Sequence, residues 1–270
     1  MNSPVPLPPR RRLAVLDMDG TLFPGTLGTA LLAHLARAGV ADTVHADAAL
    51  AALQRYHDGH DPLTPAATAV YAHYAAALRN RRRADVEQAA DQVWSVAREQ
   101  LFPFVRPLLS RLGDAGFTCL LVSGSPQEVI RLAAADLGIT YAIGTIAEIH
   151  GDRYTGTLTT AIGLPGGKTG ALTALGMHRT TSPDIAFALG NSISDAEVFH
   201  RTTHPVAFEP DAQLARLARR HAWVLADRNN LLKAVDATGL SLPPSADGDD
   251  PERHLHTPEE ARQRRRRPYS

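Results

Sequence analysis

Short apolar runs that end abruptly in polar residues constrain the fold of this chain more than any other feature. The first run, residues 13–16 (LAVL), is followed at once by residues 17–21 (DMDGT). Two later runs end in residues 123–125 (SGS) and 190–195 (GNSISD). Apolar runs of this length, bounded by turn residues, are typical of strands that are buried on both faces. We therefore predict a parallel sheet whose strand ends carry the polar residues.

The segments between the apolar runs have the composition of helices, which predicts an α/β fold. Residues 28–101 contain no strand signal and are expected to form a helical insertion after the first strand. Ser125, Pro126 and Glu128 predict a capping box that opens a helix ending at Gly138. Alternating strands and helices predict a parallel sheet with helices on both faces, a Rossmann-like arrangement. The other expected elements are helices at 105–115 and 168–175, strands at 117–122, 185–189, 205–208 and 223–227, and a hairpin of 141–149 with 154–159.

Composition divides the chain further and limits its partners. The Pro-rich residues 1–12 and the polar, Arg-rich residues 241–270 are expected to be disordered. Between them we predict a core domain of residues 13–27 and 102–240, and a helical cap of residues 28–101. The formal net charge of zero predicts neither a nucleic-acid nor a membrane partner. The oligomeric state stays open.

The single cysteine, Cys119, allows neither an internal disulfide nor a cysteine-based metal site. Residues 13–16 are too short an apolar run for a signal peptide, and no run approaches the length of a membrane span. These features predict a cytoplasmic protein.

The polar clusters can meet in one crevice, because ligands of open parallel sheets bind at the carboxyl ends of the strands. Asp17 and Asp19 could form an ordinary turn, or a metal site in which one carboxylate attacks a phosphoryl group and the other moves protons. Magnesium suits such a site, because it prefers oxygen ligands shared with a substrate phosphate. Lys168, one of only two lysines in the chain, could offset the crowded negative charge.

In their order and spacing these motifs resemble the haloacid dehalogenase superfamily, in its phosphoserine-phosphatase-like branch. DMDGT resembles its first motif, VSGS its second, the lysine of GGKTG its third and GNSISD its fourth, and the intervening helices resemble its helical cap. The resemblance implies a Mg²⁺-dependent phosphatase that acts on a small-molecule phosphomonoester through an aspartyl-phosphate. It also implies residue roles: Asp17 as nucleophile and metal ligand, Asp19 as acid/base and metal ligand through its carbonyl, Lys168 as a catalytic anchor that also binds phosphate, Thr21, Ser123 and Gly124 as phosphate-binding residues, and Asn191 and Asp195 as metal ligands.

Two positions depart from the pattern of the family. The fourth motif usually carries an aspartate at the position of Asn191, so we expect weaker magnesium binding. Phosphoserine-cleaving members carry a glutamate nine residues after the nucleophile, where this chain has Thr26, which disfavours phosphoserine as the substrate. Two alternatives stay open: a phosphotransferase that uses an alcohol acceptor, and a non-catalytic phosphate-ligand binder. In the cap, Tyr71 and Tyr74 are interpreted as helix packing, although caps also present such side chains to substrates.

Overall fold

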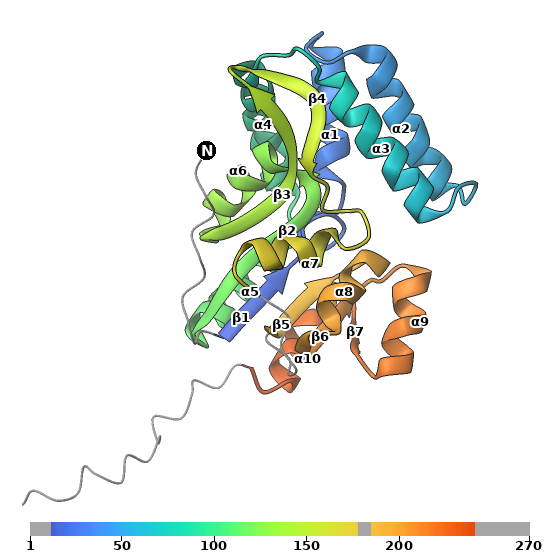
Figure 1. Cartoon of the computed structure of the whole chain (residues 1–270). Helices are drawn as coiled ribbons and strands as arrows, with labels where there is room; N and C mark the ends of the chain where they lie inside the picture. Colours follow the sequence, from blue (N-terminus) through green and yellow to red (C-terminus); the bar gives the residue numbers. More distant parts are fainter. Residues whose placement is uncertain (1–11, 178–184, 241–270) are drawn as a thin grey trace, which may run out of the picture.

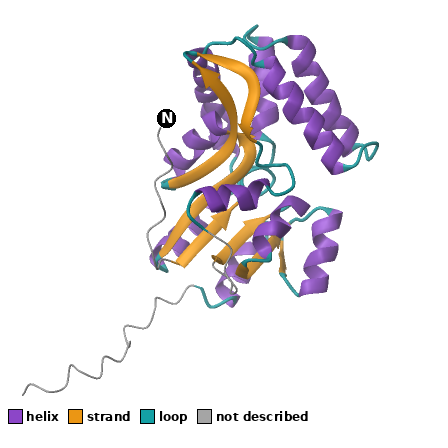
Figure 2. Cartoon of the chain, viewed as in Figure 1, coloured by secondary structure: helices purple, strands orange, loops and turns teal. Residues whose placement is uncertain are grey.

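The computed structural model describes residues 12–177 and 185–240 of the chain, which are built around a seven-stranded sheet (Figures 1 and 2). The strand order is β4-β3-β2-β1-β5-β6-β7. Neighbouring strands are parallel, except that β3 and β4 form an antiparallel hairpin. The strands are β1 (Arg12–Leu16), β2 (Phe117–Pro126), β3 (Tyr141–His150), β4 (Arg153–Thr160), β5 (Ile185–Gly190), β6 (Thr202–Phe208) and β7 (Val224–Ala226).

The predicted α/β class is confirmed, because helices cover both faces of the sheet (Figure 1). Side chains of β1 alternate between two hydrophobic clusters: Ala14 and Leu16 belong to the larger one, whereas Leu13 and Val15 belong to the smaller one. This alternation follows from the two-residue period of a strand. The larger cluster includes residues of α5 (Val105–Asp114), α6 (Gln127–Leu137) and α10 (Leu231–Ala237), and the smaller one includes residues of α7 (Gly167–Ala174), α8 (Ala196–Phe199) and α9 (Ala212–His221).

The chain between β1 and β2 is helical, as its sequence predicts. It contains α1 (Leu27–Arg37), α2 (Thr43–His57), α3 (Leu63–Ala77) and α4 (Arg83–Ala97), a 3-10 turn at Arg98–Gln100, and then α5. Helices α1 and α4 pack together and against the core helix α6, while α2 and α3 form a hairpin at one end of the molecule (Figure 1). This hairpin lies beyond the carboxyl end of β1, where the polar clusters are expected.

The predicted capping box before α6 is wrong. Strand β2 continues to Pro126, which occupies the N-cap position, and no side chain caps the helix. The hydroxyl of Ser125 donates instead to Asp19. The end of this helix is predicted correctly, because Gly138 adopts the left-handed conformation with φ of 69° that commonly terminates helices.

Strand β1 begins at Arg12, one residue earlier than predicted. The other residues of the N-terminus predicted to be disordered, 1–11, and the predicted tail, 241–270, lie outside the described residues. Among residues 12–177 and 185–240, none of the helices has both the length and the apolar character of a membrane span.

Candidate active site

The loop after β1 brings two carboxylates to the end of the sheet. The backbone N–H of Asp17 donates to the carbonyl of Leu189 at 3.0 Å, so the chain stays beside β5 for one residue beyond β1. The chain then turns at Gly20, whose φ of 74° lies in the region that glycine adopts without a steric penalty. Asp17 and Asp19, which precede this turn, both line one cavity.

Lys168 lies between two carboxylates that are distant in the sequence. Its ammonium donates to Asp17 Oδ1 at 2.8 Å and to Asp195 Oδ1 at 2.5 Å. The three side chains are at most 8% exposed, so solvent screens these ion pairs weakly. Burial raises the pKa of Asp17 to about 7 although the Lys168 ammonium lowers it, and the nearby Asp195 and Asp19 add to the rise. The pKa of Lys168 is raised by the two carboxylates despite its burial.

Asp19 is held by three hydrogen-bond donors. Its Oδ1 accepts the backbone N–H of Leu27 at 2.7 Å, and its Oδ2 accepts the hydroxyls of Ser123 at 3.0 Å and Ser125 at 2.6 Å. Burial raises the pKa of Asp19, while the hydrogen bonds, led by that of Ser125, lower it. A carboxyl group of raised pKa that is fixed in orientation has the properties of a general acid.

Two of the expected phosphate-binding hydroxyls are directed at these carboxylates. Thr21 Oγ1 donates to Asp17 Oδ2 at 2.9 Å, and Ser123 Oγ donates to Asp19. Both residues are fully buried, and neither belongs to the cavity lining, whereas Gly124 does. In this structure, therefore, Thr21 and Ser123 orient the two acids, and Gly124 and Ser125 are the residues of the second motif that line the cavity.

The fourth motif contains two differently placed side chains. Asp195 Oδ2 accepts the backbone N–H groups of Asn191 and Ser192 at 3.0 and 2.9 Å, so both carboxylate oxygens of Asp195 are engaged. Asn191 lines the cavity, and its carboxamide makes no hydrogen bond to the described part of the chain. A Cβ atom on Gly20 would overlap this carboxamide, so glycine is needed for the close approach.

Three oxygen donors can hold a metal ion here: an Asp17 carboxylate oxygen, the main-chain carbonyl of Asp19 and the Asn191 carboxamide. The carbonyl of Asp19 accepts no hydrogen bond from the described residues, as expected for a ligand that is kept available. Across residues 12–177 and 185–240, no group of three His, Cys, Asp or Glu side chains could hold a metal ion. The donor set thus depends on a carbonyl and an amide, which suit a hard cation such as Mg²⁺.

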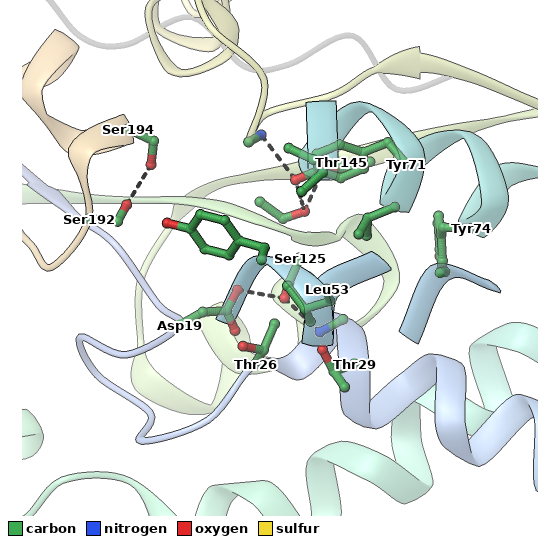
Figure 3. Close-up of a pocket in the computed structure, with 18 of the residues that line it drawn as sticks. Asp19, Thr26, Thr29, Leu53, Tyr71, Tyr74, Ser125, Thr145, Ser192 and Ser194 are labelled. Carbon is green, nitrogen blue, oxygen red and sulfur yellow. Dashed lines mark hydrogen bonds between the residues drawn. The ribbon is translucent and has the colours of Figure 1, made fainter. Parts of the chain in front are cut away.

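The cavity has a volume of about 280 Å³ and lies between the strand ends and the cap helices (Figure 3). Tyr71 of α3 crosses from the cap to the core: its hydroxyl donates to the carbonyl of Gly124 at 3.0 Å and accepts the N–H of Gly163 at 3.1 Å. In addition to any packing within the cap, Tyr71 therefore makes polar contacts with the core. Its hydroxyl links α3 to β2, at Gly124, and to the loop between β4 and α7, at Gly163.

Sequence reasoning also missed Ser125 as a partner of Asp19. The spacing of the two serines could have indicated this role. Ser123 and Ser125 are two residues apart, and residues i and i+2 of an extended segment face the same side. Both hydroxyls accordingly reach the same Asp19 oxygen (Ser125 is drawn in Figure 3). No comparable signal marks Tyr71, whose partners lie 53 and 92 residues further along the chain.

The motifs, fold and buried Asp–Lys–Asp arrangement define a class of hydrolase, and comparison with known proteins identifies the family. The family model of haloacid dehalogenase-like hydrolases matches residues 14–200, which include all four motifs. The chain belongs to this family. A relative named phosphoserine phosphatase supports its resemblance to the phosphoserine-phosphatase-like branch.

Two relatives of known name differ in how much of their length matches. Phosphoserine phosphatase SerB1 of Mycobacterium tuberculosis is 31% identical over 149 residues, which are 55% of this chain and 46% of that protein. A histidinol-phosphatase of Neisseria meningitidis is 26% identical over 224 residues, which are 79% of this chain and 97% of that protein. The chain spans about half the length of the mycobacterial relatives it matches.

Solved structures share the fold. A Bordetella pertussis protein of unknown function has a TM-score of 0.65 at 25% identity, and the match covers 81% of this chain and 99% of that one. A substrate-bound phosphoserine phosphatase has a TM-score of 0.59 at 16% identity, and the match covers 84% of this chain and 99% of that one. The second likeness concerns the fold alone.

Proposed function

We propose that this protein is a Mg²⁺-dependent phosphatase that hydrolyses a small-molecule phosphomonoester. The observation that carries the proposal is the pairing of two differently supported carboxylates in one cavity. Asp17 contacts the Lys168 ammonium and Thr21, whereas Asp19 is held by serine hydroxyls and a backbone N–H. Different surroundings allow two like groups to take different roles. Relatives named phosphoserine phosphatase and histidinol-phosphatase support the same chemistry.

In the proposed reaction, an Asp17 oxygen attacks phosphorus as the bond from phosphorus to the leaving alcohol oxygen breaks. Asp19 gives its proton to that oxygen, so that a neutral alcohol leaves and Asp17 carries the phosphoryl group as a mixed anhydride. Asp19, now ionised, removes a proton from a water molecule, which attacks phosphorus and regenerates the Asp17 carboxylate. The products are the alcohol and inorganic phosphate.

The remaining groups of the site are assigned supporting roles. Asp17, the Asp19 carbonyl and Asn191 would hold Mg²⁺, which offsets the negative charge of the phosphate and the acids when it is bound. Lys168 holds Asp17 in position and adds a second positive charge, and Gly124 presents its backbone to the phosphate. Asp195 positions Lys168 and the backbone of the fourth motif and thereby supports the metal site.

The division of the chain into two domains is part of the same proposal. Residues 13–27 and 102–240 form the catalytic core, and residues 28–101 form a cap that covers the cavity. A cap excludes bulk water from the reacting groups and selects the leaving group. The hydroxyl of Tyr71, which links α3 to β2 and to the loop before α7, supports a closed arrangement of these two parts.

Phosphate release from p-nitrophenyl phosphate with and without Mg²⁺ tests this function. We expect turnover that requires the metal and is abolished in Asp17→Asn, with trapping of phosphate on Asp17 in the wild-type protein. Asn191 motivates a second candidate, a non-catalytic phosphate-ligand binder, because the amide removes one negative charge from the metal site. Phosphate binding without any metal-dependent turnover would favour that candidate. Transfer to an added alcohol in preference to water would instead identify a phosphotransferase.

A further inference from the structure

The cavity has a charged floor and an uncharged wall. Among the described residues that line it, Asp17, Asp19 and Lys168 are the ones that carry charge, and all three belong to the core. The cap contributes an apolar wall from helices α1, α2 and α3. This wall includes Leu32, Leu50, Leu53, Leu63, Ala66 and Val70.

The polar side chains that the cap contributes to the lining carry hydroxyl groups and no charge; they are Thr29, Tyr56, Tyr71 and Tyr74. The Tyr71 hydroxyl is already bonded to the core, as donor to Gly124 and acceptor from Gly163. The Tyr74 hydroxyl is buried, and burial together with nearby Glu128 raises the pKa of Tyr74 well above its ordinary value, so the side chain stays neutral. The wall can therefore offer dispersion contacts and neutral hydroxyl groups to a ligand, but within the described residues it offers no counter-charge.

The charged groups of the floor already interact with one another or with neighbouring hydrogen-bond donors. Lys168 is paired with Asp17 and Asp195, and Asp19 accepts three hydrogen bonds. An ammonium or carboxylate on the leaving group would lie against the apolar wall without a partner. An unpaired buried charge is expected to reduce binding in the transition state by about 100-fold or more.

We propose that the cavity selects phosphomonoesters whose leaving alcohol is uncharged and largely apolar, such as a short alkyl or aryl alcohol. This inference rests on the proposed phosphatase function and adds the substrate class. The volume of about 280 Å³ lies near the lower end of the range for small-molecule sites, roughly 300–1,000 Å³, which limits the leaving group to a small one. Zwitterionic amino-alcohol phosphates are excluded by the missing counter-charges rather than by size.

A matched pair of substrates tests the proposal on the full-length, Mg²⁺-loaded protein. Propyl phosphate and phosphoethanolamine have nearly the same shape and differ in a terminal methyl against a terminal ammonium. We expect kcat/KM for propyl phosphate to exceed that for phosphoethanolamine by about 100-fold or more. From ethyl to butyl phosphate, kcat/KM should rise about fourfold for each methylene group that reaches the apolar wall.

The outcomes distinguish a failure of the proposed substrate selectivity from a failure of the proposed phosphatase function. Equal or faster turnover of phosphoethanolamine or phosphoserine would overturn the apolar selectivity, while the phosphatase function would stand. Turnover that does not change with alkyl length would likewise overturn it. If neither these substrates nor p-nitrophenyl phosphate releases phosphate, the proposed function fails as well.

A change in the wall should weaken the preference for the uncharged leaving group. Leu53 of α2 lines the cavity (Figure 3), whereas Val44 of the same helix is 75% exposed and does not line it. We expect Leu53→Asp to lower the ratio of kcat/KM for propyl phosphate over phosphoethanolamine at least tenfold, because the new carboxylate can pair with the ammonium. Val44→Asp should leave the ratio unchanged. Both values of kcat/KM are measured on the same sample, so the fraction of folded protein cancels in their ratio. A ratio in Leu53→Asp equal to that of the wild-type protein would therefore refute the proposal.

Discussion

The buried position of Lys168 between two carboxylates predicts a large stability cost for Lys168→Met. The lysine and aspartate side chains are 4–8% exposed, with N···O distances of 2.8 and 2.5 Å. Removing one partner of a buried ion pair leaves an uncompensated charge and costs about 3–5 kcal/mol. For a domain of this size, that cost corresponds to a fall in Tm of roughly 6–20 °C.

The effect should depend on pH in a defined direction. The Lys168 ammonium lowers the pKa of Asp17, so without it this carboxylate takes up a proton at a higher pH than in the wild-type protein, and the folded variant can relieve its excess charge as the pH falls. The loss in unfolding free energy should therefore be larger at pH 7.5 than at pH 5.5. Adding Asp17→Asn to Lys168→Met should recover part of the loss at pH 7.5, because one of the two unpaired charges is then removed.

Urea unfolding at both pH values measures these differences, in a chelator and again with Mg²⁺. Lys233→Met is the matched control, because Lys233 is the second lysine of the chain and is exposed on α10, and this change should alter stability by less than about 0.5 kcal/mol. A Lys168→Met protein within about 1 kcal/mol of wild type at pH 7.5 in chelator would refute the reasoning, since the buried-pair cost begins near 3 kcal/mol. A double variant no more stable than Lys168→Met would contradict the role assigned to Asp17.

Three further predictions concern single contacts. Asn191→Asp should shift the Mg²⁺ titration of activity to lower concentrations, because a carboxylate adds negative charge to the donor set; an unchanged titration would mean that the side chain is not a ligand. Ser125→Ala removes the 2.6 Å hydrogen bond that lowers the pKa of Asp19, so the Asp19-dependent limb of the pH–rate profile should move to higher pH, and a fixed limb would contradict the acid/base assignment. Tyr71→Phe removes one donor and one acceptor between cap and core, which should cost about 1–3 kcal/mol in urea unfolding, and a loss well below 0.5 kcal/mol would show that this link does not hold the two parts together.

The sequence by itself determined the local elements and the end of the sheet at which the site lies. Apolar runs followed by polar clusters have one favourable arrangement in a parallel sheet, because every strand then presents its carboxyl end to the same crevice. For this reason Asp17 and Lys168 could be assigned to one site although they are 151 residues apart. The predicted capping box is wrong for a related reason: the sequence neighbours of Ser125 indicate a helix cap, whereas its hydroxyl donates to Asp19, which follows another strand.

Only the tertiary structure decided how the polar groups are shared and what covers them. Thr21 and Ser123 donate to the carboxylates, Tyr71 joins the cap to the core, and the wall above Asp17 is apolar. Each of these facts depends on side-chain directions and on contacts between segments far apart in the chain. Hydrophobic periodicity specifies which face of a helix is buried, but not which side chains of another element it meets. Local motifs therefore predict the reaction centre, whereas the proposed selectivity of the cavity depends on the packing between elements.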